Sequence, residues 1–261
     1  MTKTLGFTLI ELSIVLVIIG LLVGGVLLGN DLIKAAEIRS TIKQSEDFQT
    51  AIKTFQLKYN CLPGDCRDAA QFGFQTRTGA SGHGDGNGFY ENCNPLTGWY
   101  LQGCETLLFW RDLSEANLIS GGFSSATDAN DTISSANLPL YFPTSKVGSG
   151  YFMVWNSTNI VVANIRQYQN YMSIVNVNGS VDISGITPLP SMTPHQAMAI
   201  DTKVDDAMPV SGKILGGINQ GAAGLFPGTP GGATDCAIDN ATYNTIPPYA
   251  TTVMCVLSFQ L

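Results

Sequence analysis

The sequence predicts an α+β protein in which a long N-terminal helix packs on a head made of an antiparallel β-sheet and short extra helices. Three observations predict this fold. Residues 7–29 are almost wholly apolar and carry one formal charge. Residues 30–59 then repeat apolar side chains at helical spacing. Beyond residue 150, short β-branched and aromatic runs predict strands.

Residues 7–29 predict a helix that crosses a membrane. At 1.5 Å per residue this run is about 35 Å long, enough to span a hydrocarbon core of roughly 30 Å. Its one charge, Glu11, is unusual, because an acid in such a segment costs free energy unless it has a partner. A cleaved secretory signal peptide is the alternative, but residues 30–37 continue in helical register where small cleavage-site residues are expected.

The start of the chain carries a specific motif. Gly6-Phe7-Thr8-Leu9-Ile10-Glu11 follows a short basic leader and resembles the cleavage and methylation signal of type IV prepilins and type II secretion pseudopilins. The resemblance implies a pilin-like fold, removal of residues 1–6 by a prepilin peptidase that cuts between Gly6 and Phe7, and N-methylation of Phe7. It also implies that Glu11 contacts the amino terminus of a neighbouring subunit. A plain membrane anchor with Glu11 among the lipid headgroups is the alternative.

The same resemblance implies a function, a location and partners. The chain would be a structural subunit of a type IV pilus or a type II secretion pseudopilus. It would wait in the inner membrane as a single-pass protein with a periplasmic head, and lie in a filament or at the cell surface after assembly. Its partners would be other pilin or pseudopilin subunits, the prepilin peptidase and the inner-membrane assembly platform. A minor, tip-located binding module that recognises a surface or a secretion substrate is the alternative function.

Residues 30–60 predict the amphipathic half of the same helix. The apolar positions recur every three or four residues or multiples of these, and they are Ala35, Ile38, Ile42, Phe48, Ile52, Phe55 and Tyr59. One continuous helix from residue 7 to about residue 59 would measure roughly 80 Å. Four glycines between residues 20 and 29 weaken helix propensity, so two helices with a bend are the alternative. Pro63 and Gly64 end the helix, and residues 61–261 form the loop-rich head.

All six cysteines follow the apolar segment, and their even number predicts disulfides in an oxidising compartment. They are Cys61, Cys66, Cys93, Cys104, Cys236 and Cys255. We favour the sequential pairing, because the first pair spans a Pro-Gly turn and the last would tie the C-terminal strand to the loop before it. A zinc site is the alternative, but the chain has no CxxC pair and only two histidines.

Composition and motifs argue against nucleic-acid binding and against an enzyme. The net charge is −7, and loss of Lys3 with the leader makes it −8, which argues against nucleic acid as a partner. The G-x-S-x-G, H-E-x-x-H and P-loop patterns are missing. We therefore expect a protein that is not an enzyme and has no cofactor; calcium is a candidate metal.

Two acidic stretches are candidate metal-binding sites. Asp85, Asn87 and Glu91 are candidate calcium ligands, but their spacing does not match an EF-hand, so a glycine-rich turn is the preferred interpretation. Asp201, Asp205 and Asp206 could hold calcium or serve catalysis. A solvated helix end whose charge is offset by Lys203 or Lys213 is preferred there.

The head is expected to alternate short helices and strands. A helix is predicted over 103–118 with Trp110 in the core, then a surface loop over 120–150. Strands are predicted at 151–155, 159–165 and 171–177, the first two forming a hairpin. Thr193-Pro194 should open a helix that ends near residue 205. The last strand, within 251–261, is apolar on both faces, which suits a central position in the sheet.

Overall fold

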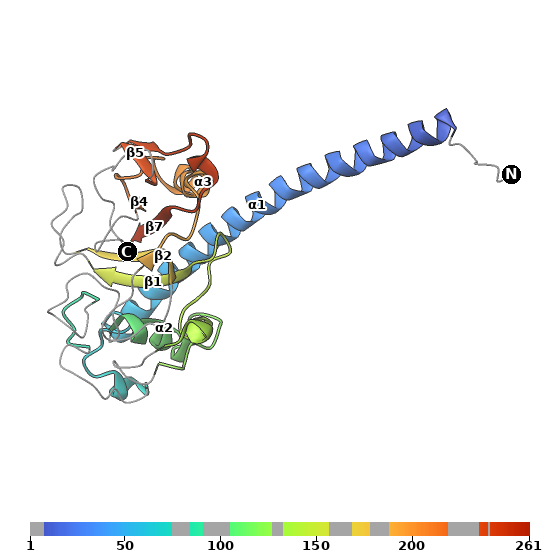
Figure 1. Cartoon of the computed structure of the whole chain (residues 1–261). Helices are drawn as coiled ribbons and strands as arrows, with labels where there is room; N and C mark the ends of the chain where they lie inside the picture. The colour runs from blue at the N-terminus through green and yellow to red at the C-terminus, as the bar shows by residue number, and fades with distance from the viewer. Residues whose placement is uncertain are drawn as a thin grey trace.

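The computed structural model describes residues 8–74, 84–90, 105–126, 133–156, 169–177, 188–218, 235–239 and 241–261. One long helix projects from a head in which short helices pack against an antiparallel sheet (Figure 1). The α+β fold that the sequence predicts is therefore confirmed.

The elements are as follows. The helices are α1 (Leu9–Tyr59), α2 (Glu105–Glu115) and α3 (Pro194–Val204), with 3-10 turns η1 (Ala69–Phe72), η2 (Ser135–Leu140) and η3 (Tyr249–Thr251). The strands are β1 (Tyr151–Asn156), β2 (Asn170–Val177), β3 (Pro188–Leu189), β4 (Ile214–Ile218), β5 (Ala237–Asp239), β6 (Thr242–Tyr243) and β7 (Cys255–Gln260).

Helix α1 is continuous over 51 residues, or about 76 Å. It begins after the N-cap Thr8 and ends at Asn60, whose left-handed backbone (φ 55°) closes the last turn. The glycines between residues 20 and 29 do not interrupt it, so the alternative of two separate helices is wrong. Its N-terminal half protrudes from the head (Figure 1).

The C-terminal half of α1 packs on the head through one stripe of side chains. The buried members are Thr41, Ser45, Phe48, Ala51, Ile52 and Phe55. Phe48 meets the edge of Trp110 in α2 at 4.8 Å and of Phe152 in β1 at 5.1 Å between ring centroids. Phe55 stacks on Phe74 at 5.6 Å. The predicted face is confirmed except at Ala35, which is exposed because contact with the hydrophobic core begins only at Ile38.

The main sheet has the strand order β1-β2-β7-β4, with β3 paired to β2, and every pair is antiparallel. Strand β7 lies between β2 and β4, and its residues from Cys255 to Phe259 are buried, as its two apolar faces predict. Strand β1 pairs with β2. The expected strand at 159–165, and with it the expected hairpin, lies outside the described residues.

The predicted short helices are confirmed, with Trp110 of α2 fully buried. Helix α3 begins at a capping box in which Thr193 and Gln196 bond each other's backbone N–H groups. The surface loop expected over 120–150 is confirmed only in part, because exposed residues alternate there with buried ones. Leu138 and Val147 are buried there, and the Val147 N–H donates to Thr41 Oγ1 at 3.0 Å, because the segment packs against α1.

Two of the three expected disulfides lie among the described residues. Cys61–Cys66 closes the turn that follows α1, and Cys236–Cys255 joins the residue before β5 to the first residue of β7. Both match the sequential pairing. Cys93 and Cys104 lie outside the described residues.

Candidate functional site

The acid in the apolar segment bonds the start of its own helix. The Thr8 backbone N–H and hydroxyl both donate to Glu11 Oε2, at 2.7 and 2.8 Å, and the Glu11 N–H donates to Thr8 Oγ1 at 3.3 Å. This capping box places a negative charge at the positive end of the helix dipole. The Thr-x-x-Glu spacing before an apolar run is the sequence signal for this capping box, which we did not predict.

One carboxylate oxygen of Glu11 stays available. Both Thr8 donors reach Oε2, and no described residue donates to Oε1. The side chain is exposed, so a donor from outside the subunit could reach Oε1. The two predicted cleavage residues, Gly6 and Phe7, lie outside the described residues.

The first half of α1 has nothing to pack against within the described chain. Every Leu, Ile and Val from Leu9 to Ile33 is at least 50% exposed. Burying one such side chain fully is worth about 1.5–3 kcal/mol, so leaving the whole set in water would cost tens of kcal/mol. By length and composition α1 can cross a membrane. The helix therefore suits a single-pass anchor or the interior of an assembly.

Comparison with known families identifies this end of the chain. Residues 1–27 match the family model of the prokaryotic N-terminal methylation motif. The chain carries a type IV pilin-like signal. The match covers about a tenth of the 261 residues and does not extend into the head. No curated protein and no solved structure matches the chain.

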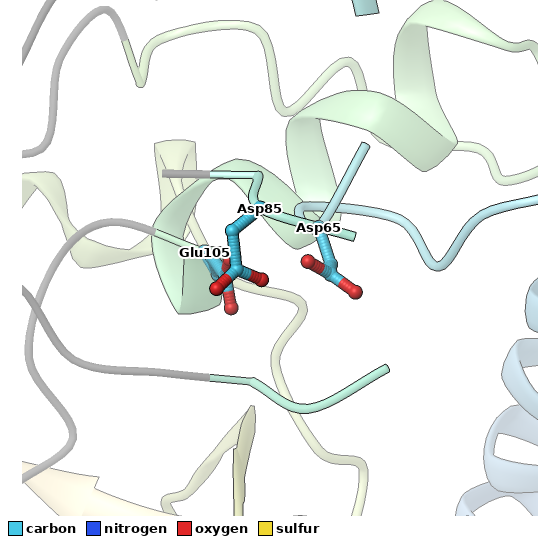
Figure 2. A group of neighbouring side chains, drawn as sticks. All are labelled: Asp65, Asp85 and Glu105. Atoms are coloured by element: carbon cyan, nitrogen blue, oxygen red, sulfur yellow. The ribbon is translucent and has the colours of Figure 1, made fainter. Parts of the chain in front are cut away.

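Away from the pilin-like signal, the head brings three carboxylates together beside α2. Asp65 follows α1 inside the Cys61–Cys66 loop, Asp85 lies in the glycine-rich turn 84–90, and Glu105 is the first residue of α2. One oxygen from each lies within 4.8 Å of the others. Figure 2 shows the side chains converging from three separate segments.

Backbone N–H groups of the turn 84–90 hold this acidic group in place. Gly86 and Gly88 donate to the two oxygens of Asp65 at 2.7 and 2.8 Å, and Gly84 donates to Glu105 Oε1 at 3.0 Å. All three glycines have positive φ. L-residues adopt this backbone conformation only with strain, so glycine suits all three positions.

The loop after α1 also docks on the N-terminal turn of α2. Gly64 has φ +86°, and a Cβ there would collide with the carbonyl oxygen of Glu105. Its N–H donates to the buried carboxylate of Asp112 at 2.7 Å. Only glycine allows this approach, which brings Asp65 to Glu105.

Burial governs the electrostatics of the group. It raises the pKa of Asp65, against the lowering effect of the Gly88 and Gly86 N–H groups, and the charge of Asp85 adds to the rise. Burial also raises the pKa of Tyr90 far above its ordinary value, helped by the charges of Asp65, Glu105 and Asp112. The Tyr90 ring meets Phe109 of α2 edge-on at 5.2 Å.

The structure places one of the three calcium candidates predicted from the sequence in this acidic group. Asp85 is in the acidic group, whereas the Asn87 side chain bonds within the turn: its amide donates to Asp85 Oδ2 at 3.1 Å and its oxygen accepts the Phe89 N–H at 2.8 Å. Glu91 lies outside the described residues. Sequence reasoning missed Asp65 and Glu105, because about twenty residues separate each from Asp85 and no local spacing connects them.

The second acidic group, at the end of α3, is partly buried. Asp201 is 0% exposed and accepts a hydrogen bond from the Tyr243 hydroxyl at 2.9 Å, while its Oδ1 has no partner among the described residues. Burial raises its pKa to about 7; the hydrogen bond from Tyr243 opposes this rise, and the charges of Asp206 and Asp205 add to it.

The expected solvated helix end is therefore wrong for Asp201. No described ion pair joins this group to Lys203 or Lys213. Asp205 instead accepts the backbone N–H groups of Lys213 and Ile214, at the start of β4. The group thus connects α3 to the sheet.

Proposed function

We propose that this protein is a non-enzymatic structural subunit of a type IV pilus or a type II secretion pseudopilus. The observation that carries the proposal is the methylation motif over residues 1–27, which continues directly into an exposed apolar helix. A prepilin peptidase removes residues 1–6 and methylates Phe7. Subunits wait in the inner membrane with the head in the periplasm, and the assembly platform then packs them into a filament.

The apolar half of α1 supports this two-stage use. Lipid chains and neighbouring helices are both apolar, so moving the helix from the bilayer into a filament core keeps its side chains out of water. The projection of this half from the head leaves its whole circumference open to other subunits (Figure 1). The docked half then holds the head at a fixed position relative to the filament axis.

Glu11 supplies the contact between subunits in this proposal. After cleavage, Phe7 carries a new amino group that is positively charged at neutral pH. In an apolar core, a carboxylate and an amine stabilise each other only when they are paired. Thr8 occupies Oε2, so Oε1 is the oxygen that receives the neighbouring subunit's amine. The pair would set the axial register between subunits.

Intact mass of the mature chain tests the processing step. The mass should correspond to loss of Met1 to Gly6 with one added methyl group on Phe7. An unprocessed chain from cells that contain an active prepilin peptidase would contradict the proposal.

Three variants test the role of Glu11. Glu11→Ala and Glu11→Gln should both lower the amount of the chain in sheared filaments, while its total amount stays unchanged. The amide variant keeps an acceptor oxygen for the helix cap but loses the charge, so its normal assembly would exclude an ionic contact. Glu46→Ala removes an exposed acid from the docked half of the same helix and should assemble like the wild type.

The position of the chain in filaments separates the main proposal from a tip-located module. Immunogold labelling along the whole filament is expected of a shaft subunit. Labelling confined to filament ends would instead assign the chain to a minor tip protein.

A further inference from the structure

We propose that Asp65, Asp85 and Glu105 form a binding site for one calcium ion, with the Tyr90 hydroxyl facing the same space. The site would fasten the turn 84–90 to the end of α1 and the start of α2. It lies in the head and does not depend on how the N-terminal helix is used. Three carboxylates from three segments meet there (Figure 2).

The spacing of the oxygens fits a calcium ion. Calcium binds oxygen at about 2.3–2.6 Å, so two oxygens on one ion are at most about 5 Å apart. The three carboxylate oxygens lie within 4.8 Å of one another. Each oxygen of Asp65 accepts one N–H group and keeps a second lone pair for a metal. Magnesium requires shorter, nearly octahedral contacts and gives up its water reluctantly, so calcium suits this irregular set better.

The hydroxyl of Tyr90 is a second, independent indication of a ligand. Tyr90 is 2% exposed, and its hydroxyl has no hydrogen-bond partner among the described residues. A buried hydroxyl without a partner costs roughly 1–3 kcal/mol. The ring packs edge-on against Phe109, one helical turn from Glu105 on the same face of α2. The Tyr90 ring therefore lies on the side of α2 that carries the acidic group, and an ion bound there would give its hydroxyl oxygen a partner.

The charge of the acidic group also favours a cation. Within the described chain, no basic side chain forms an ion pair with Asp65 or Asp85. Arg67 contacts the turn, but its guanidinium donates to the backbone carbonyl of Asp85, at 3.1 and 2.7 Å, and not to the carboxylate. The N–H groups of the turn fix the carboxylates and supply only partial positive charge. A divalent ion would supply Asp65 and Asp85 with a full positive charge.

Calcium titration of the full chain in detergent, after removal of metal by EDTA, tests the site. Calorimetry should detect one calcium ion bound with a dissociation constant of about 10⁻⁴–10⁻³ M or tighter, the range of extracellular calcium modules. Magnesium should bind more weakly. Hydrogen exchange of peptides that cover the turn 84–90 should slow when calcium is added. Absence of calcium binding at millimolar concentration would overturn the proposal.

Asp85→Asn is the decisive variant, because Asp85 is only half-buried and an asparagine keeps the acceptor oxygen for the Asn87 N–H. It should weaken calcium binding by roughly tenfold or more without unfolding the head. Asp206→Asn makes the same change in the other acidic group and should bind calcium like the wild type. Wild-type affinity in Asp85→Asn, or loss of binding in Asp206→Asn alone, would overturn the assignment.

Discussion

Asp201 makes the stability of the head depend on pH in an unusual direction. Its pKa is raised from an ordinary value of 3.8 to about 7 by burial, so the folded state holds a proton that the unfolded state releases. Between these two values the folded chain binds more protons, and stability therefore falls as pH rises. The stabilisation is complete below about pH 4 and is lost by about pH 7.

The Asp201→Asn variant isolates this effect. An amide cannot ionise, its oxygen can still accept the Tyr243 hydroxyl, and its NH₂ group can donate toward Asp205 or Asp206. At about 1.4 kcal/mol per pH unit, the interval from 3.8 to about 7 corresponds to at most ~4 kcal/mol. The variant should match the wild type near pH 4 and exceed its stability at pH 8 by up to that amount.

Thermal unfolding of the full chain in one detergent, followed by near-UV circular dichroism from pH 4 to pH 8, measures the difference. Each kcal/mol should shift the midpoint by roughly 2–4 °C in a chain of this size. Asp47→Asn, which removes an exposed carboxylate on α1, controls for the loss of one charge. If the unfolding midpoints of Asp201→Asn and the wild type differ by the same amount at every pH, or if the variant is less stable at pH 8, the reasoning is refuted.

Two further predictions concern how the head is held together, and unfolding measurements check both. Phe55→Ala should lower the free energy of unfolding by about 3–5 kcal/mol, because Phe55 is fully buried where α1 packs on the head. Leu57→Ala, at an 89% exposed position, should change it by less than about 0.5 kcal/mol. Replacing both cysteines of Cys236–Cys255 by serine should lower the free energy of unfolding by about 3 kcal/mol, and the same change at Cys61–Cys66 by about 2 kcal/mol. Cys236–Cys255 closes the longer loop, so its removal frees more chain entropy in the unfolded state. An equal loss of unfolding free energy in Phe55→Ala and Leu57→Ala would contradict the first prediction, and an equal loss in the two double-serine variants would contradict the second.

Local patterns in the sequence were sufficient for the elements and for the pilin-like signal. The apolar run and the three- and four-residue spacing that follows it depend only on residues near in sequence, and α1 follows them from end to end. Thr193-Pro194 places the start of α3 for the same reason. Ala35 was wrongly placed in the buried stripe, because periodicity defines a helical face but not where the head begins to cover it.

The sequence by itself determined the methylation motif, the long helix with its apolar half, the α+β class and a pairing of cysteines that holds for both described bridges. Only the tertiary structure decided which acids share a site and which is buried. Asp65, Asp85 and Glu105 meet because Gly64 lets the chain approach α2 and the turn 84–90 directs its N–H groups inward. Asp201 is buried and accepts a hydrogen bond from Tyr243 of β6, 42 residues further along the chain. Such contacts join residues far apart in the chain, and local spacing does not encode them.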